Sequence, residues 1–226
     1  MATADAPAPT VGAPDYVEVY DEPLHPTVFQ NEYVRVLKVN CPSNQETMLH
    51  RHSQDSFFLF FRTAQIRNET VGKEPFEAKL EAGSFYWGDH LANPIIHKIC
   101  VGKHDLDCMD VEFNEDRPKP ASLSPTLPNV ASKRDLCFEN DVVRAYRVNI
   151  VKGESIAEVL ADADAAEARG GGLEGVGFSY LAIALKSAKL SRGEVKAGDS
   201  WWCGGGADDT WSNAGEQVEV MILQPK

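Results

Sequence analysis

Three histidines in the first half of the chain have the spacing of a metal site. His50 and His52 are two residues apart in a segment that favours an extended backbone, and His97 follows in a later one. In a strand, residues i and i+2 face the same side, so the first two imidazoles project into one space. A third inward-facing histidine would let three nitrogens surround one divalent ion, which suits Zn, Fe, Ni or Cu.

An H-x-H pair alone is a weak signal of a metal site, because two histidines on one strand more often lie at a surface. Several neighbouring residues are weaker candidates for the same site. His25, His90 and His104 are predicted to be surface residues, His90 in a loop near the barrel mouth. Asp55 remains open between a metal ligand, an acceptor that orients a histidine ring, and a surface residue. Cys100 is interpreted as a buried, inert thiol.

Aromatic and polar side chains near the histidines are candidates for a pocket wall. Aromatic residues at strand spacing belong to the core in most proteins, although some line pockets. Arg35 could meet an anionic substrate, but it recurs as Arg144 in the histidine-free half, which favours a structural role. The candidates for the wall are Phe58, Phe60, Tyr86, Gln54 and Glu46.

The elements that must position these residues occur twice. The segment FQNEYVRVLKVN (29–40) returns as FENDVVRAYRVN (138–149), and AGSFYW (82–87) returns as AGDSWW (197–202). An internal repeat of this length indicates two copies of one fold unit. The second copy holds no histidine. We therefore predict one working site and one scaffold.

Short strands separated by Gly, Asn and Pro predict an all-β sandwich or barrel in each copy. Residues 33–40 alternate in polarity, and the continuous apolar run 56–61 predicts a strand buried on both faces. Further strands are predicted at 83–89, 95–101, 106–113, 142–150, 178–185, 194–196, 200–203 and 217–224. The interior of the second copy is predicted to be filled by Trp201, Trp202 and Trp211.

The predicted boundaries divide the chain into a tail, two domains and a linker. Residues 1–15 form a disordered Ala- and Pro-rich tail, 16–116 the domain with the metal site, 117–131 a Pro-rich linker, and 132–226 the second domain. Residues 154–169, rich in Ala and Glu, predict a short helical insertion where the first copy carries its histidine pair. A lid over a site and drift after loss of the metal both explain this insertion.

Composition and charge exclude several classes of protein. The chain has 22 Lys and Arg against 34 Asp and Glu, and its net charge of -12 argues against nucleic acid and membrane surfaces as partners. It has neither an apolar run that could span a bilayer nor the basic start of a secretory signal. Five scattered cysteines without a CxxC pair fit a reducing compartment, so we expect a cytoplasmic protein without a disulfide framework.

The first copy resembles the cupin superfamily. In that family one motif runs from Gly through H-x-H to Glu, and a second from Gly through Pro to His. The segments that carry the resemblance are NQETMLHRHSQDSFFLFF (44–61) and GSFYWGDHLANPIIHKICVG (83–102), in which the matching residues are His50, His52, Gly83, Pro94 and His97. Asn44 stands where the family's first Gly is usual, and the family's Glu falls at Ser56 or Phe57. The whole chain resembles a bicupin with a degenerate C-terminal copy.

This resemblance implies two jelly-roll β-barrels and one metal held by three neutral histidines. Family members of that type include thiol and diketone-cleaving dioxygenases, so it implies an Fe(II)-dependent oxygenase acting on a small molecule. Mn, Ni, Cu and Zn are the alternative metals. A non-catalytic binding or structural bicupin, and a metal-dependent isomerase or lyase, are the alternative functions. Because a bicupin resembles a fused dimer, we expect a monomer or a homodimer.

Overall fold

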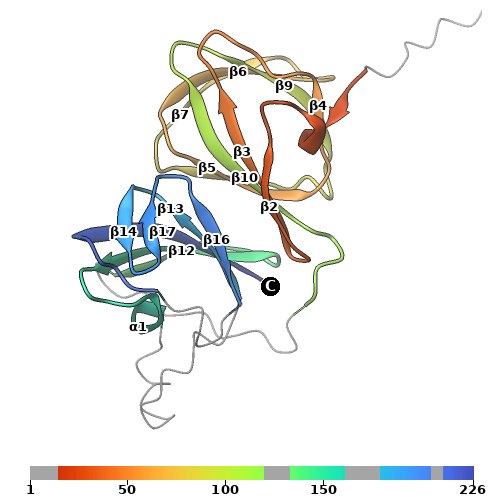
Figure 1. Cartoon of the computed structure of the whole chain (residues 1–226). Helices are drawn as coiled ribbons and strands as arrows, with labels where there is room; N and C mark the ends of the chain where they lie inside the picture. Colours follow the sequence, from red (N-terminus) through yellow and green to blue (C-terminus); the bar gives the residue numbers. More distant parts are fainter. Residues whose placement is uncertain (1–14, 120–132, 161–178, 205–210) are drawn as a thin grey trace, which may run out of the picture.

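The computed structural model describes residues 15–119, 133–160, 179–204 and 211–226. Within these ranges the chain is mostly β-strand and forms two domains, which lie one above the other in Figure 1. Nearly all of the predicted tail and linker, and most of the predicted helical insertion, lie outside the described residues. None of the described helices has the length and apolar character needed to cross a membrane.

The first domain is a barrel of two five-stranded sheets. One sheet has the order β1 (Val17–Glu18), β4 (His50–His52), β9 (Ile95–Val101), β6 (Ala64–Thr70) and β7 (Phe76–Leu80). The other has the order β2 (Thr27–Gln30), β3 (Val34–Cys41), β10 (Leu106–Phe113), β5 (Asp55–Phe60) and β8 (Phe85–Gly88). A short 3-10 helix, η1 (Val19–Asp21), follows β1. Neighbouring strands are antiparallel except β1 and β4.

Strand β5 has two apolar faces, as its continuous apolar sequence predicts. Phe57 and Leu59 pack in a cluster shared with the second domain, whereas Phe58 and Phe60 pack inside the barrel. This division follows from the alternation of side chains along a strand. The same strand therefore builds both the contact between domains and the interior of the first barrel.

The second domain repeats the β2–β3–β10–β5–β8 sheet in the same strand order. Its sheet has the order β11 (Arg134–Glu139), β12 (Val143–Val151), β17 (Gln217–Pro225), β13 (Tyr180–Ala184) and β16 (Ser200–Cys203). The repeated segments 29–40 and 138–149 cover β2–β3 and β11–β12. The internal repeat thus reflects one sheet built twice.

The residues that recur between the two copies have structural roles. In Asn31 and Asn140, the side-chain Oδ1 accepts hydrogen bonds from the backbone N–H groups two and three residues later, at 2.9 Å in every case. Such contacts define a turn that asparagine favours. Arg35 and Arg144 each pair with a glutamate on a neighbouring strand, at 3.0 and 2.7 Å. These pairs agree with the structural role predicted for Arg35.

The second layer of this domain is reduced. Among the described residues it comprises the hairpin of β14 (Ala188–Leu190) and β15 (Gly193–Val195), isolated bridges, and α1 (Ile156–Leu160). Ser155 and Glu158 cap α1 reciprocally: the Ser155 backbone N–H donates to Glu158 Oε2 at 2.7 Å, and the Glu158 N–H donates to Ser155 Oγ at 3.2 Å. The helix buries its apolar residues in the core of its own domain. The lid interpretation covered the whole insertion 154–169; its described part packs in the core of this domain, and residues 161–169 lie outside the described ranges.

The two domains share one apolar core, formed where β3, β5 and β10 face β12, β13 and β17 (Figure 1). Trp202 lies in this interface, stacked 5.0 Å from Tyr33 and 6.5 Å from Phe29 between ring centroids. The prediction that it fills the second barrel is therefore wrong. Trp201 and Trp211 do pack inside that domain. Because adjacent residues of a strand face opposite sides, Trp201 and Trp202 cannot share one interior.

Asn44 occupies the position where the family motif usually has glycine. Its backbone φ is 60°, in the left-handed region. Glycine enters this region without steric cost, and asparagine is among the residues that tolerate it best. The departure from the family motif therefore preserves the backbone conformation ahead of the histidine pair.

Candidate metal centre

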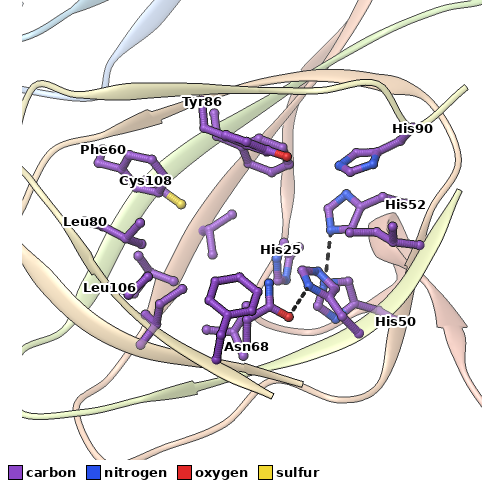
Figure 2. Close-up of a pocket in the computed structure, with 18 residues that line it drawn as sticks. His25, His50, His52, Phe60, Asn68, Leu80, Tyr86, His90, Leu106 and Cys108 are labelled. Atoms are coloured by element: carbon purple, nitrogen blue, oxygen red, sulfur yellow. Dashed lines mark hydrogen bonds between the residues drawn. The ribbon is translucent and has the colours of Figure 1, made fainter. Parts of the chain in front are cut away.

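Strands β4 and β9 bring three histidines together inside the first barrel. On the short strand β4, His50 and His52 are buried, whereas Arg51 between them pairs with Glu18 at 2.8 Å. On β9, His97 lies directly opposite His50 in the antiparallel register. Each of the three offers a ring nitrogen within 4.8 Å of the others, and all are buried. Figure 2 shows His50 and His52 at one end of the pocket.

An acceptor faces the Nδ1 atom of each ring. For His50, His97 and His52 in turn, these acceptors are the Met48 carbonyl at 2.8 Å, Asn68 Oδ1 at 3.2 Å and Asp110 Oδ2 at 3.4 Å. The contacts of His50 and His97 are hydrogen bonds, so we assign the hydrogens of these two neutral rings to Nδ1. Nδ1 of His52 faces the Asp110 carboxylate without forming a hydrogen bond, and this carboxylate favours the same tautomer for His52. This tautomer leaves the Nε2 lone pairs available to a ligand.

The Nε2 atoms form a donor set that fits a metal ion. Those of His50 and His52 lie 3.1 Å apart, and the buried Nε2 of His97 has no hydrogen-bond partner among the described residues. One of these two nitrogens can donate a hydrogen bond to the other in the metal-free chain, whereas with the hydrogens on Nδ1 both lone pairs can bind one cation. Two nitrogens bound at right angles about 2.1 Å from one metal are roughly 3 Å apart. The cluster can therefore hold a divalent metal.

Burial keeps these imidazoles neutral. It lowers the pKa of His50 to about 3 and holds the pKa values of His52 and His97 well below the usual range. Neighbouring rings add to the effect, because a charge on one would repel a charge on the next. Neutral imidazole is the form that binds metals, so the donors need lose no proton at ordinary pH.

The histidines close one end of a pocket of about 330 Å³ inside the barrel. Phe58, Phe60 and Tyr86, predicted as wall residues, all line it, and Phe60 and Leu80 lie at the end away from the histidines (Figure 2). Tyr86 on β8 and Phe76 on β7 are exposed wall residues, at 57% and 54%. Because β7 and β8 are the edge strands of the two sheets, these aromatics mark the mouth.

Comparisons with known proteins bear on the fold. No protein-family model matches the chain, and no curated protein matches its sequence. Among solved structures it is similar to a cupin 2 conserved barrel domain protein from Leptotrichia buccalis, at 12% identity over 88% of this chain and 87% of the other, with a TM-score of 0.51. It is likewise similar to YhhW from Escherichia coli, at 11% identity over 88% of each chain, with a TM-score of 0.51.

The chain has the cupin fold. Its two barrels make it a bicupin, and the histidine cluster lies in the first barrel. Oxalate decarboxylase from Bacillus subtilis overlaps less well, at 8% identity over 86% of this chain and 69% of the other, with a TM-score of 0.49. Identities this low concern the fold alone, so the chemistry of this bicupin is argued from its own residues.

Two residues predicted near the centre of this bicupin lie elsewhere. Asp55 begins β5, where its Oδ1 accepts a hydrogen bond from the Leu91 backbone N–H at 3.0 Å, and it does not join the three-histidine group. The Gln54 side chain does not line the pocket; its Oε1 accepts a hydrogen bond from the Glu115 backbone N–H at 3.2 Å. Both side chains accept hydrogen bonds from backbone N–H groups of neighbouring loops, and they thereby stabilise the connections around β5.

Two further candidates face away from the pocket. Glu46 is exposed and pairs with Lys98 at 2.9 Å. Cys100, predicted to be buried, is half-buried, and its thiol donates to the same carboxylate at 3.4 Å. The thiol that does line the pocket belongs to Cys108, whose pKa is raised by burial. All five cysteines are free of disulfides, as their spacing predicts.

His25 and His90, predicted to lie at the surface, are buried in the pocket wall beside the cluster. Each is 5% exposed, and their ring centroids lie 4.7 Å from His50 and 5.3 Å from His52, respectively. Their positions depend on loops. The segment before β2 runs along β3, and the hydrogen bond to Asp55 fixes the loop after His90. The sequence did not indicate that His25 and His90 are buried, because each is an isolated histidine outside a strand motif. His104 is exposed, as predicted.

The buried carboxylate of Glu22 contacts both the His25 side chain and the backbone next to His50. It is 2% exposed, and its Oε2 lies 2.5 Å from Nδ1 of His25. Its two oxygens also accept hydrogen bonds from the backbone N–H groups of Leu24 at 2.7 Å and Met48 at 3.0 Å. Met48 in turn provides the carbonyl that orients His50. One buried carboxylate therefore links two histidines of the pocket.

Asp110 is a buried carboxylate that sequence reasoning missed. It lies on β10, fully buried, and neither oxygen makes a well-aligned hydrogen bond within the described chain. The Ser56 hydroxyl is close enough to lower its pKa but donates to the Gln54 carbonyl at 3.2 Å. Burial outweighs this contact and raises the pKa of Asp110 to about 6. The signal was present in β10, where Asp110 and Glu112 interrupt the apolar pattern on the inward face.

Proposed function

We propose that the first barrel holds one iron(II) ion through His50, His52 and His97 and oxidises a small molecule with dioxygen. The observation that carries this proposal is the convergence of three buried, neutral imidazoles whose Nδ1 atoms all face acceptors. The Nε2 atoms of His50 and His52, 3.1 Å apart, converge with the Nε2 of His97, which has no hydrogen-bond partner among the described residues.

When bound, iron supplies Lewis-acid and redox chemistry at this end of the pocket. The chain's own residues prepare the environment. Three neutral ligands keep the full charge of the ion and leave other positions for small molecules. The aromatic wall formed by Phe58 and Phe60 excludes water. His25, whose Nδ1 contacts Glu22, lines the pocket beside the centre.

Metal analysis of the purified protein tests the metal site. We expect roughly one iron per chain, lost in His50→Ala and retained in His104→Ala, which removes an exposed histidine of the same domain. Absence of metal above background from the unaltered protein would contradict the proposal.

Oxygen uptake by the iron-loaded protein, measured across a panel of small organic substrates, tests the reaction. The expected result is substrate-dependent uptake that disappears in His50→Ala. Substrate conversion without uptake would identify a metal-dependent isomerase or lyase. Ligand binding without conversion would identify a binding bicupin.

A further inference from the structure

The wall of the pocket in the first barrel carries no lysine or arginine among the described residues. Cations of this domain are paired elsewhere: Arg35 contacts Glu112, Lys38 contacts Asp107, and Lys98 contacts Glu46. The described part of the wall therefore offers no cationic side chain to an anion that enters the pocket beyond the histidines.

The buried charges near the histidines have the opposite sign. Glu22 accepts hydrogen bonds around His25, and Asp110 lies 3.4 Å from His52. Carboxylates behind a neutral wall disfavour a second negative charge in front of it. Burying an ionised group without a partner is costly in any apolar site.

The far end of the pocket is apolar. Figure 2 shows Phe60, Leu80 and Leu106 gathered opposite the histidines. Asn68, a polar residue of the wall, already accepts a hydrogen bond from His97 at its Oδ1. With a volume of about 330 Å³, the pocket lies at the lower end of the range of roughly 300–1,000 Å³ for ligand sites.

We propose that this pocket takes a small, uncharged and largely apolar organic molecule, with its metal-binding end at the histidines and its apolar part against Phe60, Leu80 and Leu106. The orientation of the polar end rests on the proposed metal site. The preference for an uncharged, apolar ligand depends only on the residues that line the pocket.

Two probes with one metal-binding head test the proposal on cobalt(II)-loaded protein. 4-Phenylimidazole has an apolar tail, and 4-(imidazol-4-yl)benzoate adds a carboxylate to the same ring. Titrations followed by the visible spectrum of the cobalt are expected to show the phenyl probe binding on the order of 100-fold more tightly, because the carboxylate would be buried without a partner. Equal affinity, or tighter binding of the carboxylate probe, would overturn the proposal.

A cation placed at the mouth should change this preference. Phe76 lines the pocket yet is 54% exposed, so Phe76→Arg can be accommodated without burying its charge. It is expected to tighten binding of the carboxylate probe about 10-fold and to change the phenyl probe by less than about 3-fold, since a paired charge costs less than an unpaired one. Val71→Arg is the matched control, because Val71 is 46% exposed and outside the pocket wall. Equal effects of both variants on the carboxylate probe would count against selection by the pocket.

The metal-free protein separates this proposal from the proposed function. Calorimetry with indole and indole-2-carboxylate measures selection by the wall when no ion is present. Preference for indole supports the proposal even if no metal binds to the histidines. Metal binding at the histidines together with a preference for the carboxylate would leave the metal site standing and overturn the substrate class.

Discussion

Asp110 Oδ2 lies 3.4 Å from Nδ1 of His52, and both residues are buried. The carboxylate faces the ring nitrogen opposite to Nε2, the atom that approaches His50. A carboxylate in this position orients a ligating histidine and increases the basicity of its other nitrogen. Asp110 thus lies beside the cluster on a different strand than the one that carries the family's usual glutamate.

Replacing Asp110 should weaken metal binding without removing a ligand. Asp110→Asn keeps the shape of the side chain but removes its charge, and we expect metal affinity to fall by about 10–100-fold. Competition against a chelator measures the change. Glu112→Gln is the control, because Glu112 is equally buried on the same face of β10 but pairs with Arg35. Equal affinities for Asp110→Asn and the unaltered protein would show that the carboxylate does not act on His52.

Glu22→Gln should destabilise the region around His25 and Met48. The carboxylate contacts His25 and accepts from two backbone N–H groups, and loss of a buried hydrogen-bond acceptor costs about 1–3 kcal/mol. Urea denaturation of the metal-free protein measures this cost. Glu46→Gln, at an exposed position, should change stability by less than about 0.5 kcal/mol. Similar values for the two variants would argue against the bridging role of Glu22.

Acid should destabilise the metal-free protein through His50. Its pKa is about 3 in the folded chain, against an ordinary value of 6.5, so between these values the unfolded chain binds more protons and stability falls as the pH falls. His50→Gln removes this titration. Its stability relative to the unaltered protein should therefore rise toward low pH, by up to about 1.4 kcal/mol per pH unit. Denaturation series at several pH values give the difference, from which carboxylates common to both proteins largely cancel. A difference independent of pH would contradict the lowered pKa.

Truncation of the interface should weaken both domains together. Phe57 is fully buried in the shared core, and Phe57→Ala is expected to cost about 3–5 kcal/mol. Intrinsic fluorescence reports both halves, because Trp87 belongs to the first domain and Trp211 to the second. Tyr86→Ala, at an exposed position on the adjacent strand, should cost less than about 1 kcal/mol. Two separate fluorescence transitions in Phe57→Ala, in place of one, would show that the domains unfold independently.

The main features of the fold could be predicted from the sequence because they depend on local periodicity. The repeat of residues 29–40 at 138–149 follows one pair of strands built twice, and the apolar run 56–61 gives a strand with two packed faces. The proximity of His50 and His52 required only the alternation of a strand. The approach of His97 required the antiparallel register of β4 and β9, which the cupin resemblance implied.

The remaining neighbours of the cluster depend on contacts between segments far apart in the sequence. His25 reaches the pocket because the chain before β2 runs along β3, and Asp110 because β10 turns one face inward. Periodicity describes one element at a time, so it does not reveal which loops or strands meet. Asp55 shows the converse. It is close to the histidine pair in sequence, yet its carboxylate accepts a hydrogen bond from the Leu91 backbone N–H and does not join the cluster.

Through the apolar core shared by the domains, the histidine-free half supports the half that carries the histidine cluster. Strands β5 and β10 carry Phe58 and Asp110 on the pocket side and press Phe57 and Val111 against the other domain. A substitution in the second domain can therefore displace pocket residues that it does not contact. Any constraint on the geometry of the histidine cluster extends in this way to the packing of the domain that lacks it.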